Sequence, residues 1–224
     1  MVQRSADSTI TAAQKIGPNA RGVAADVSTA AGCAALLQQV PTVDILVNNA
    51  GIFEPKPFTE IPDADWEHFY QVNVMSGVRL TRAYLPGLLQ RNWGRVIFMS
   101  SESGMQIPEE MIHYGMTKAA ELALVNGIAQ LTRNTNVTVN AVLPGPTASE
   151  GVTDFVDKLA AGAKQTSAEF EKEFFRSVRP TSLLQRFATV DEVASMVAYL
   201  CSPLASATNG AAIRVDGGVL RGTL

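Results

Sequence analysis

A tyrosine, a lysine and a serine in this chain are spaced so that they can act together on one substrate oxygen. Tyr114 and Lys118 stand four positions apart, and Ser101 lies thirteen positions before Tyr114. Side chains four apart on a helix share a face, so we expect Lys118 beside Tyr114. A neighbouring ammonium favours the phenolate and pulls the pKa of a tyrosine down from about 10. The three residues therefore predict general acid–base chemistry.

The elements that must position these residues follow from the hydrophobic pattern. Short apolar runs alternate with longer helical patterns, which is typical of a parallel sheet covered by helices. Strands are predicted at Gly22–Asp26, Val43–Asn48, Gly94–Met99, Val137–Val142 and Ala211–Val215. Helices are expected through Ala34–Leu37, from about Asp63 to Gln90, from about Pro108 to Arg133 and at Val190–Leu200. The third helix would carry Tyr114 and Lys118, and Ser101 would follow the strand at 94–99.

Residues 151–187 depart from the strict alternation and are helical in character. They contain Phe155, Phe170, Phe174 and Phe175 on otherwise polar segments. No internal repeat, low-complexity tract or linker divides the chain, so residues 1–224 are predicted to form a single α/β domain.

The bulk composition excludes several classes of function. The 224 residues are 46% hydrophobic and 17% charged, with a net charge of −3 and a pI near 5.4. Lysine and arginine are scattered, which argues against nucleic acid and acidic membrane surfaces as main partners. Cys33 and Cys201 lack metal-ligand spacing, so we expect no metal site and no disulfide framework. No apolar run reaches membrane-spanning length, and a soluble cytoplasmic protein is predicted.

Several short motifs stand around the tyrosine in a fixed order. They are Asp26-Val27, Asn48-Asn-Ala-Gly51, Asn73, Ser101, Tyr114-x-x-x-Lys118, Pro144-Gly145 and Val215-Asp-Gly-Gly218. In this order the chain resembles the short-chain dehydrogenase/reductase family, from about residue 20 to the C-terminus. The resemblance implies a Rossmann-like parallel sheet with helices on both faces. It also implies hydride transfer between NAD(H) or NADP(H) and a secondary alcohol or ketone.

The resemblance assigns roles to individual residues. Tyr114 would exchange a proton with the substrate oxygen, Ser101 would hold that oxygen, and Asn73 would anchor a proton-relaying water. Lys118 would lower the tyrosine pKa and contact the nicotinamide ribose. The residues implied to bind the cofactor are Arg4, Asp26, Val27, Asn48, Ala50, Gly51, Tyr114, Lys118, Pro144, Gly145 and Thr147.

Three of these assignments have structural alternatives. The stretch Asn48–Gly51 is also an ordinary strand-to-loop turn, because Asn and Gly favour turns. Asp26 either contacts the adenine or caps the following helix. Arg4 falls where the family often places an arginine that contacts the 2′-phosphate of NADP, which favours NADP slightly over NAD. The alternative is that Arg4 is a solvated loop residue.

The Gly-rich cofactor turn that opens the family is not found before Asp26. Relative to the family we expect an N-terminal βαβ start, on the order of 30 residues, to be missing. The strand at 43–48 would then become an exposed apolar edge, although its sequence is typical of a central strand. Three explanations are open: a fragment or mis-assigned start, a partner or swapped segment that fills the gap, or a rearranged, cofactor-poor protein. We favour the first.

Residues 147–187 correspond to the substrate-covering segment of the family. Its phenylalanines either line an apolar pocket or, as we favour slightly, form the inner stripe of helices packed on the core. His113, a lone histidine, is expected at the surface without a role. The expected partners are a small alcohol or carbonyl substrate and further copies of the chain, as a homodimer or homotetramer. The alternative function is a catalytically silent homologue that acts as a binding or oligomerisation partner.

Overall fold

Two buried parallel strands form the centre of the sheet. In the computed structural model, which describes residues 6–153, 156 and 165–222, β2 (Gly94–Met99) lies beside β3 (Val137–Pro144). The edge strands are β1 (Ile45–Asn48) and β4 (Ala212–Val215), and the order β1-β2-β3-β4 is parallel throughout. The largely apolar sequences of β2 and β3, in which nearly every residue is buried, reflect burial on both faces. The predicted α/β class and parallel sheet are confirmed.

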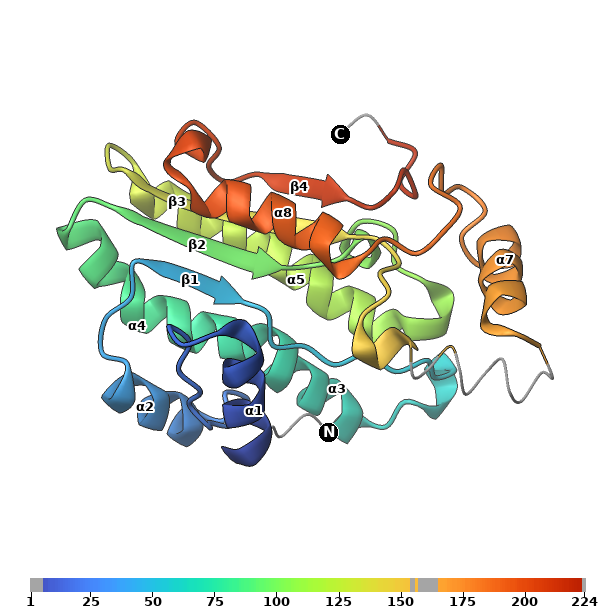
Figure 1. Ribbon diagram of the computed structural model, residues 1–224, viewed down its shortest axis with the longest axis horizontal. Coiled ribbons are helices and arrows are strands. Elements are labelled where there is room, and N and C mark those ends of the chain that lie inside the picture. Colours follow the sequence, from blue (N-terminus) through green and yellow to red (C-terminus); the bar gives the residue numbers. More distant parts are fainter. Residues whose placement is uncertain (1–5, 154–155, 157–164, 223–224) are drawn as a thin grey trace.

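Helices cover both faces of this sheet, as Figure 1 shows. One face packs on α4 (Ser76–Gln90) and α5 (Ile112–Ala129), through a core that includes Leu88, Phe98 and Val125. The other face packs on α8 (Val190–Cys201), where Ile97 and Val142 are buried. Other helices are α1 (Ala6–Ile16), α2 (Ala30–Gln39), α3 (Asp63–Phe69) and α7 (Ser167–Ser177), and residues 150–153 are also helical. Short 3-10 turns are η1 (Phe58–Glu60), η3 (Glu102–Gly104), η4 (Glu109–Met111), η5 (Gln130–Thr132) and η6 (Pro203–Ala205).

The long helix expected from Asp63 to Gln90 is divided by a π-helical segment. This segment, η2 (Tyr70–Met75), lies between α3 and α4 and contains the buried Asn73. A π-bulge inserts one residue into a helical turn and often marks a functional position. The hydrophobic period predicts the helix but not this local change of winding.

The strand predicted at Gly22–Asp26 does not form. Residues 20–26 have no regular structure, and a Cβ built on Gly22 would lie 2.7 Å from the carbonyl oxygen of Thr9 in α1. A strand requires a neighbour with which to exchange backbone hydrogen bonds. Among the described residues this segment passes against a helix and not against a strand, which explains the wrong prediction.

The strand β1 lies at the edge of the described sheet, as expected. Its side chains alternate: Ile45 and Val47 are 41% and 39% exposed, whereas Leu46 is 8% exposed and joins the core. One face of the strand is therefore open to solvent, in contrast to its central-strand sequence.

Helices α7 and α8 each begin at a capping box. In each box the threonine hydroxyl accepts a hydrogen bond from the glutamate N–H, and the glutamate carboxylate accepts one from the threonine N–H. The pairs are Thr166 with Glu169 and Thr189 with Glu192. Within residues 151–187, Phe175 is buried among other rings, while Phe155 lies outside the described residues. In the described parts of the chain, none of the helices combines the length and the hydropathy that a membrane span requires.

Candidate active site

The carboxyl ends of the strands open into one cavity of about 880 Å³. In open α/β sheets ligands bind at this edge. Of the residues predicted for the site, the cavity is lined by Gly51, Ser101, Tyr114, Lys118, Pro144, Gly145 and Thr147. Three strand ends and the first turns of α5 thus bring together residues that are up to 96 positions apart, from Gly51 to Thr147.

Tyr114 and Lys118 lie on one face of α5. The Lys118 Nζ atom is 5.8 Å from the centre of the Tyr114 ring. Phe53, from the loop after β1, meets the same ring edge-on at a centroid distance of 6.3 Å. The phenol is therefore held between an ammonium and an aromatic ring at the wall of the cavity.

The Lys118 ammonium is almost fully enclosed by protein acceptors. It donates to the backbone oxygen of Met99 at 2.7 Å and to both carboxylate oxygens of Glu121 at 3.1 Å. Burial raises the pKa of Glu121 to about 7, and the Lys118 charge opposes that rise. Sequence reasoning missed Glu121, although an acidic residue three positions after Lys118 on an apolar helix was a usable signal.

Ser101 lies two positions after the end of β2 and is buried. Its Oγ accepts a hydrogen bond from the backbone N–H of Ser103 at 3.1 Å, which caps the turn η3. Its neighbour Ser100 donates its hydroxyl to the backbone oxygen of Lys118 at 2.8 Å. This bond joins the strand end to α5 and fixes Ser101 relative to the tyrosine and lysine.

Asn73 joins the loop after β1 to α5. Its Oδ1 accepts from the Ile52 N–H at 2.8 Å, and its Nδ2 donates to the Ile52 oxygen at 3.0 Å and to Thr117 Oγ1 at 2.9 Å. All three contacts are with protein groups, and Asn73 does not line the cavity. Asn73 therefore holds the loop after β1 against α5 from behind the cavity.

Some residues of the Asn48–Gly51 turn line the cavity, and others do not. Asn48 is buried, and its Nδ2 donates to Thr81 Oγ1 at 3.1 Å. Its Oδ1 is buried without a hydrogen-bond partner among the described residues. A Cβ on Gly51 would lie 3.6 Å from Lys118 Nζ and 3.7 Å from Asn73 Oδ1, so the missing side chain keeps this part of the cavity open. Ala50 is exposed and does not line the cavity.

The turn after β3 requires glycine for steric reasons. A Cβ on Gly145 would lie 2.6 Å from the backbone oxygen of Asp216, which is too close for any other residue. Thr147 donates its hydroxyl to the Gly145 oxygen at 2.9 Å. Pro144, Gly145 and Thr147 together form the wall of the cavity beneath the covering segment.

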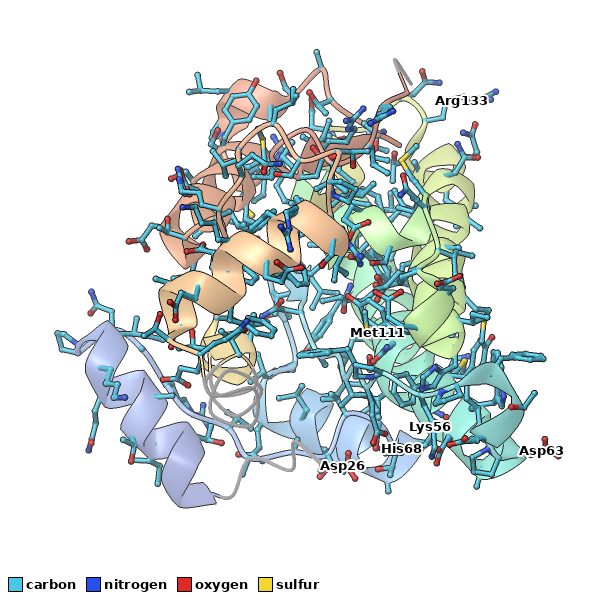
Figure 2. The ribbon with its side chains drawn as sticks, turned by 90° about the vertical axis from the view of Figure 1, so that its right-hand side faces the viewer. Asp26, Lys56, Asp63, His68, Met111 and Arg133 are labelled. Carbon is cyan, nitrogen blue, oxygen red and sulfur yellow. The ribbon has the colours of Figure 1, made fainter. Side chains whose placement is uncertain are left out.

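Four predicted cofactor positions among the described residues, Asp26, Val27, Asn48 and Ala50, do not line the cavity. Asp26 accepts from the Ser28 N–H at 3.1 Å and from the Ser28 hydroxyl at 2.6 Å, in the turn that leads into α2. Val27 packs against the core of the sheet. Figure 2 shows Asp26 well apart from Met111, which lines the cavity. The geometry favours the turn-forming alternative for Asp26, and Arg4 lies outside the described residues.

A second charged group in the cavity was not predicted from the sequence. Arg179, which follows α7, donates to Glu102 Oε1 at 3.0 Å and to Glu110 Oε1 at 3.3 Å. Burial raises the pKa of Glu102, and Arg179 lowers it in part. The aromatic side chains that line the cavity here are Phe170, Phe174 and Phe187. The covering segment therefore contributes an apolar wall as well as packed core residues such as Phe175.

Comparison with known proteins identifies the class to which this fold and site belong. The family described as Enoyl-(Acyl carrier protein) reductase matches residues 2–220. The chain belongs to the short-chain dehydrogenase/reductase family of oxidoreductases.

Individual relatives agree with this assignment. The chain is 48% identical to the uncharacterized oxidoreductase YvaG of Bacillus subtilis (strain 168), over 88% of this chain and 74% of that protein. It is 45% identical to YvrD of the same organism, over 98% of this chain and 84% of that protein. The L-sorbose reductase of Gluconobacter frateurii, solved with NADPH and L-sorbose, superposes with a TM-score of 0.90 at 29% identity, over 98% of this chain and 85% of that one.

The residues present fit one half of a nicotinamide dinucleotide. Gly51 leaves open space beside Lys118 and Asn73, and the orphaned Oδ1 of Asn48 is an acceptor at the same end of β1. These features suit a ribose and a carboxamide, which carry hydrogen-bond donors and acceptors.

Proposed function

We propose that this chain interconverts a secondary alcohol and a ketone with NAD(P)(H), using Tyr114 as the general acid and base. The observation that carries the proposal is the joint placement of Tyr114, Lys118 and Ser101 at the wall of one cavity, with Lys118 Nζ 5.8 Å from the Tyr114 ring. A hydroxyl donor, a phenol and an ammonium at one point are the groups that carbonyl reduction requires.

The chain's own residues handle the proton. In reduction, the Tyr114 hydroxyl donates its proton to the carbonyl oxygen, and in oxidation the phenolate accepts it from the alcohol. Ser101 donates a hydrogen bond to the same oxygen and keeps it within reach of Tyr114. Lys118 would stabilise the phenolate, and it would bind the nicotinamide ribose by turning one of its three donors from a protein acceptor, Met99 or Glu121, to a ribose hydroxyl. Hydride transfer to or from the substrate carbon is the chemistry that the bound nicotinamide supplies.

The covering segment would exclude water from the reaction. Phe170, Phe174 and Phe187 present rings to the cavity, and Arg179 ties the segment to Glu102, the residue after Ser101. A dry site strengthens the electrostatic effect of Lys118 on the phenol. We further propose NADP(H) in preference to NAD(H), on the sequence position of Arg4 and on the NADPH bound in the L-sorbose reductase.

The proposal is tested by binding and turnover in the same variant. NADH and NADPH are titrated into the purified protein while the cofactor fluorescence is followed, and binding is expected below millimolar concentration. Tyr114→Phe keeps the ring that packs on Phe53 and removes only the hydroxyl. Turnover of ketones is expected to fall by at least about a thousandfold, with the cofactor Kd nearly unchanged. Retained turnover would refute the role of Tyr114.

The alternative function, a silent homologue acting as a binding partner, is not favoured. All four predicted catalytic residues are present, and three of them face the same cavity. Absence of binding of either cofactor at millimolar concentration would reverse this preference.

A further inference from the structure

Glu121 and Lys118 form a buried ion pair behind the active-site cavity. Both carboxylate oxygens lie 3.1 Å from Lys118 Nζ, and the two side chains are 2% and 6% exposed respectively. The third proton of the ammonium is donated to the Met99 backbone oxygen at 2.7 Å. An ammonium has three donors, so all three are directed at protein groups at once.

A pair of this kind is not required for stability. Burying two charges costs about as much as their attraction returns, and apolar side chains of similar volume are often equally stable. On the face of α5 that Glu121 shares, Val125 belongs to the apolar core of the sheet. The pair is explained more directly by the need to hold a cation at a fixed place beside Tyr114.

We propose that Glu121 is a positioning residue, whose carboxylate fixes the Lys118 ammonium and balances the charge that Lys118 places beside Tyr114. This inference rests on the proposed function, in which Lys118 serves the tyrosine and the cofactor ribose. Glu121 does not line the cavity, so it acts through Lys118 and not on the substrate.

Three of the other acidic groups near α5 form ion pairs elsewhere. The elements packed against α5 carry Tyr70 on η2, Asp63, Asp65, Glu67 and His68 on α3, Glu102 on η3, and Glu109 and Glu110 on η4. β3 and η5 carry no ionisable side chain. Glu102 and Glu110 pair with Arg179, and Asp65 pairs with Lys56. Within the described residues, Lys118 is the charge that acts on Glu121.

The pair gives the site a pH-dependent charge. The pKa of Glu121 is raised to about 7, mainly by burial. Below that pH the carboxyl group takes up a proton and the Lys118 charge is no longer balanced. An unbalanced ammonium favours the phenolate of a neighbouring tyrosine. Removing the carboxylate charge by substitution should have the same effect at every pH.

The kinetic test compares Glu121→Gln, Glu121→Asp and a matched surface control. In the alcohol-oxidising direction, the rising limb of the pH–rate profile of Glu121→Gln should move to lower pH by about one unit. Glu121→Asp keeps the charge, so its limb should stay in place while kcat falls several-fold because Lys118 is held less well. Asp44→Asn, from an exposed pair with Arg91 just before β1, should match the wild type. Superimposable profiles for Glu121→Gln and the wild type would overturn the proposal.

A second measurement needs neither cofactor nor turnover. The side chains of ¹⁵N-lysine-labelled wild-type protein are followed by NMR from pH 5 to 9, and the Lys118 signal is assigned by its loss in Lys118→Arg. The Lys118 Nζ resonance should inflect near pH 7 as Glu121 ionises. A resonance that stays constant across this range would overturn the proposal even if Glu121→Gln does not fold.

The two measurements separate this inference from the proposed function. If the wild type shows no turnover with NADH or NADPH but the Lys118 signal inflects, the proposed function fails and the charge balance of the pair stands. If turnover is present but neither the pH–rate profile nor the Lys118 resonance responds to Glu121, the proposed function stands and the positioning role of Glu121 fails.

Discussion

His113, the residue before Tyr114, is fully buried although it was expected at the surface. Its ring lies 4.0 Å from that of Phe69 and 5.9 Å from that of Trp66, measured between centroids. Neither ring nitrogen has a hydrogen-bond partner among the described residues. Such a ring is accommodated only in its neutral form, and burial accordingly lowers the pKa of His113.

This environment predicts that His113 weakens the fold in acid. The unfolded chain protonates a histidine near pH 6.5, while the folded chain resists protonation until a lower pH. Between these two values the unfolded state binds more protons, so the free energy of unfolding falls as the pH is lowered. His113→Phe keeps the aromatic packing and removes this titration. We expect the variant to gain stability relative to the wild type below about pH 6.5.

The measurement is the free energy of unfolding in urea for both proteins from pH 5 to 8. The difference between them is compared at each pH, because Glu121 contributes the opposite slope: its raised pKa stabilises the fold below about 4.5 and that contribution is lost as the pH rises through about 7. A difference that is constant with pH would show that His113 does not titrate on unfolding in this range.

At the scale of elements, local patterns were sufficient for much of the fold and site. The apolar runs located β1 to β4, and the four-residue spacing placed Lys118 beside Tyr114 on α5. Contacts between distant segments were not predictable in this way. Arg179 meets Glu102 across 77 positions, and no local pattern marks either residue as half of a pair. The prediction of a strand at residues 22–26 was wrong for the same reason. This segment lies against α1, and the hydrophobic period of a segment does not reveal which element it packs against.

The Arg179 bridge predicts that one arginine secures the covering segment. Arg179 is 11% and Glu102 is 5% exposed, so Arg179→Ala leaves a buried carboxylate without its partner. Breaking such a pair from one side costs about 3 kcal/mol. We expect a loss of that order in the free energy of unfolding, together with faster proteolytic cleavage within residues 165–187.

Arg176→Ala is the matched control for this experiment. Arg176 lies three positions away on α7, and its pair with Glu173 is 78% exposed on the arginine side. Exposed pairs contribute little, so this variant should remain within about 0.5 kcal/mol of the wild type. Equal effects of the two substitutions would show that the bridge to Glu102 does not hold the segment.

At the scale of the whole molecule, the open face of β1 is the feature that sets the protein's behaviour in solution. Ile45 and Val47 are exposed on β1, which has a neighbouring strand on one side only in the described sheet, and Val47 also lines the cavity. Exposed apolar edges promote association between chains. We therefore predict that the wild type self-associates at micromolar concentration, and that a charge at the exposed position reduces association without unfolding the sheet.

The substitution that tests this is Ile45→Lys, with Leu46→Lys as its counterpart on the opposite face. Successive strand residues face opposite sides, so Ile45→Lys places the ammonium in water, while Leu46→Lys places it in the core between the sheet and α4. Light scattering after size exclusion should show a smaller mass for Ile45→Lys than for the wild type, with unchanged circular dichroism. Leu46→Lys should instead lose several kcal/mol of stability, as expected for an unpaired buried charge. If Ile45→Lys associates as the wild type does, the chains meet through another surface, and the free edge of β1 is not what joins them.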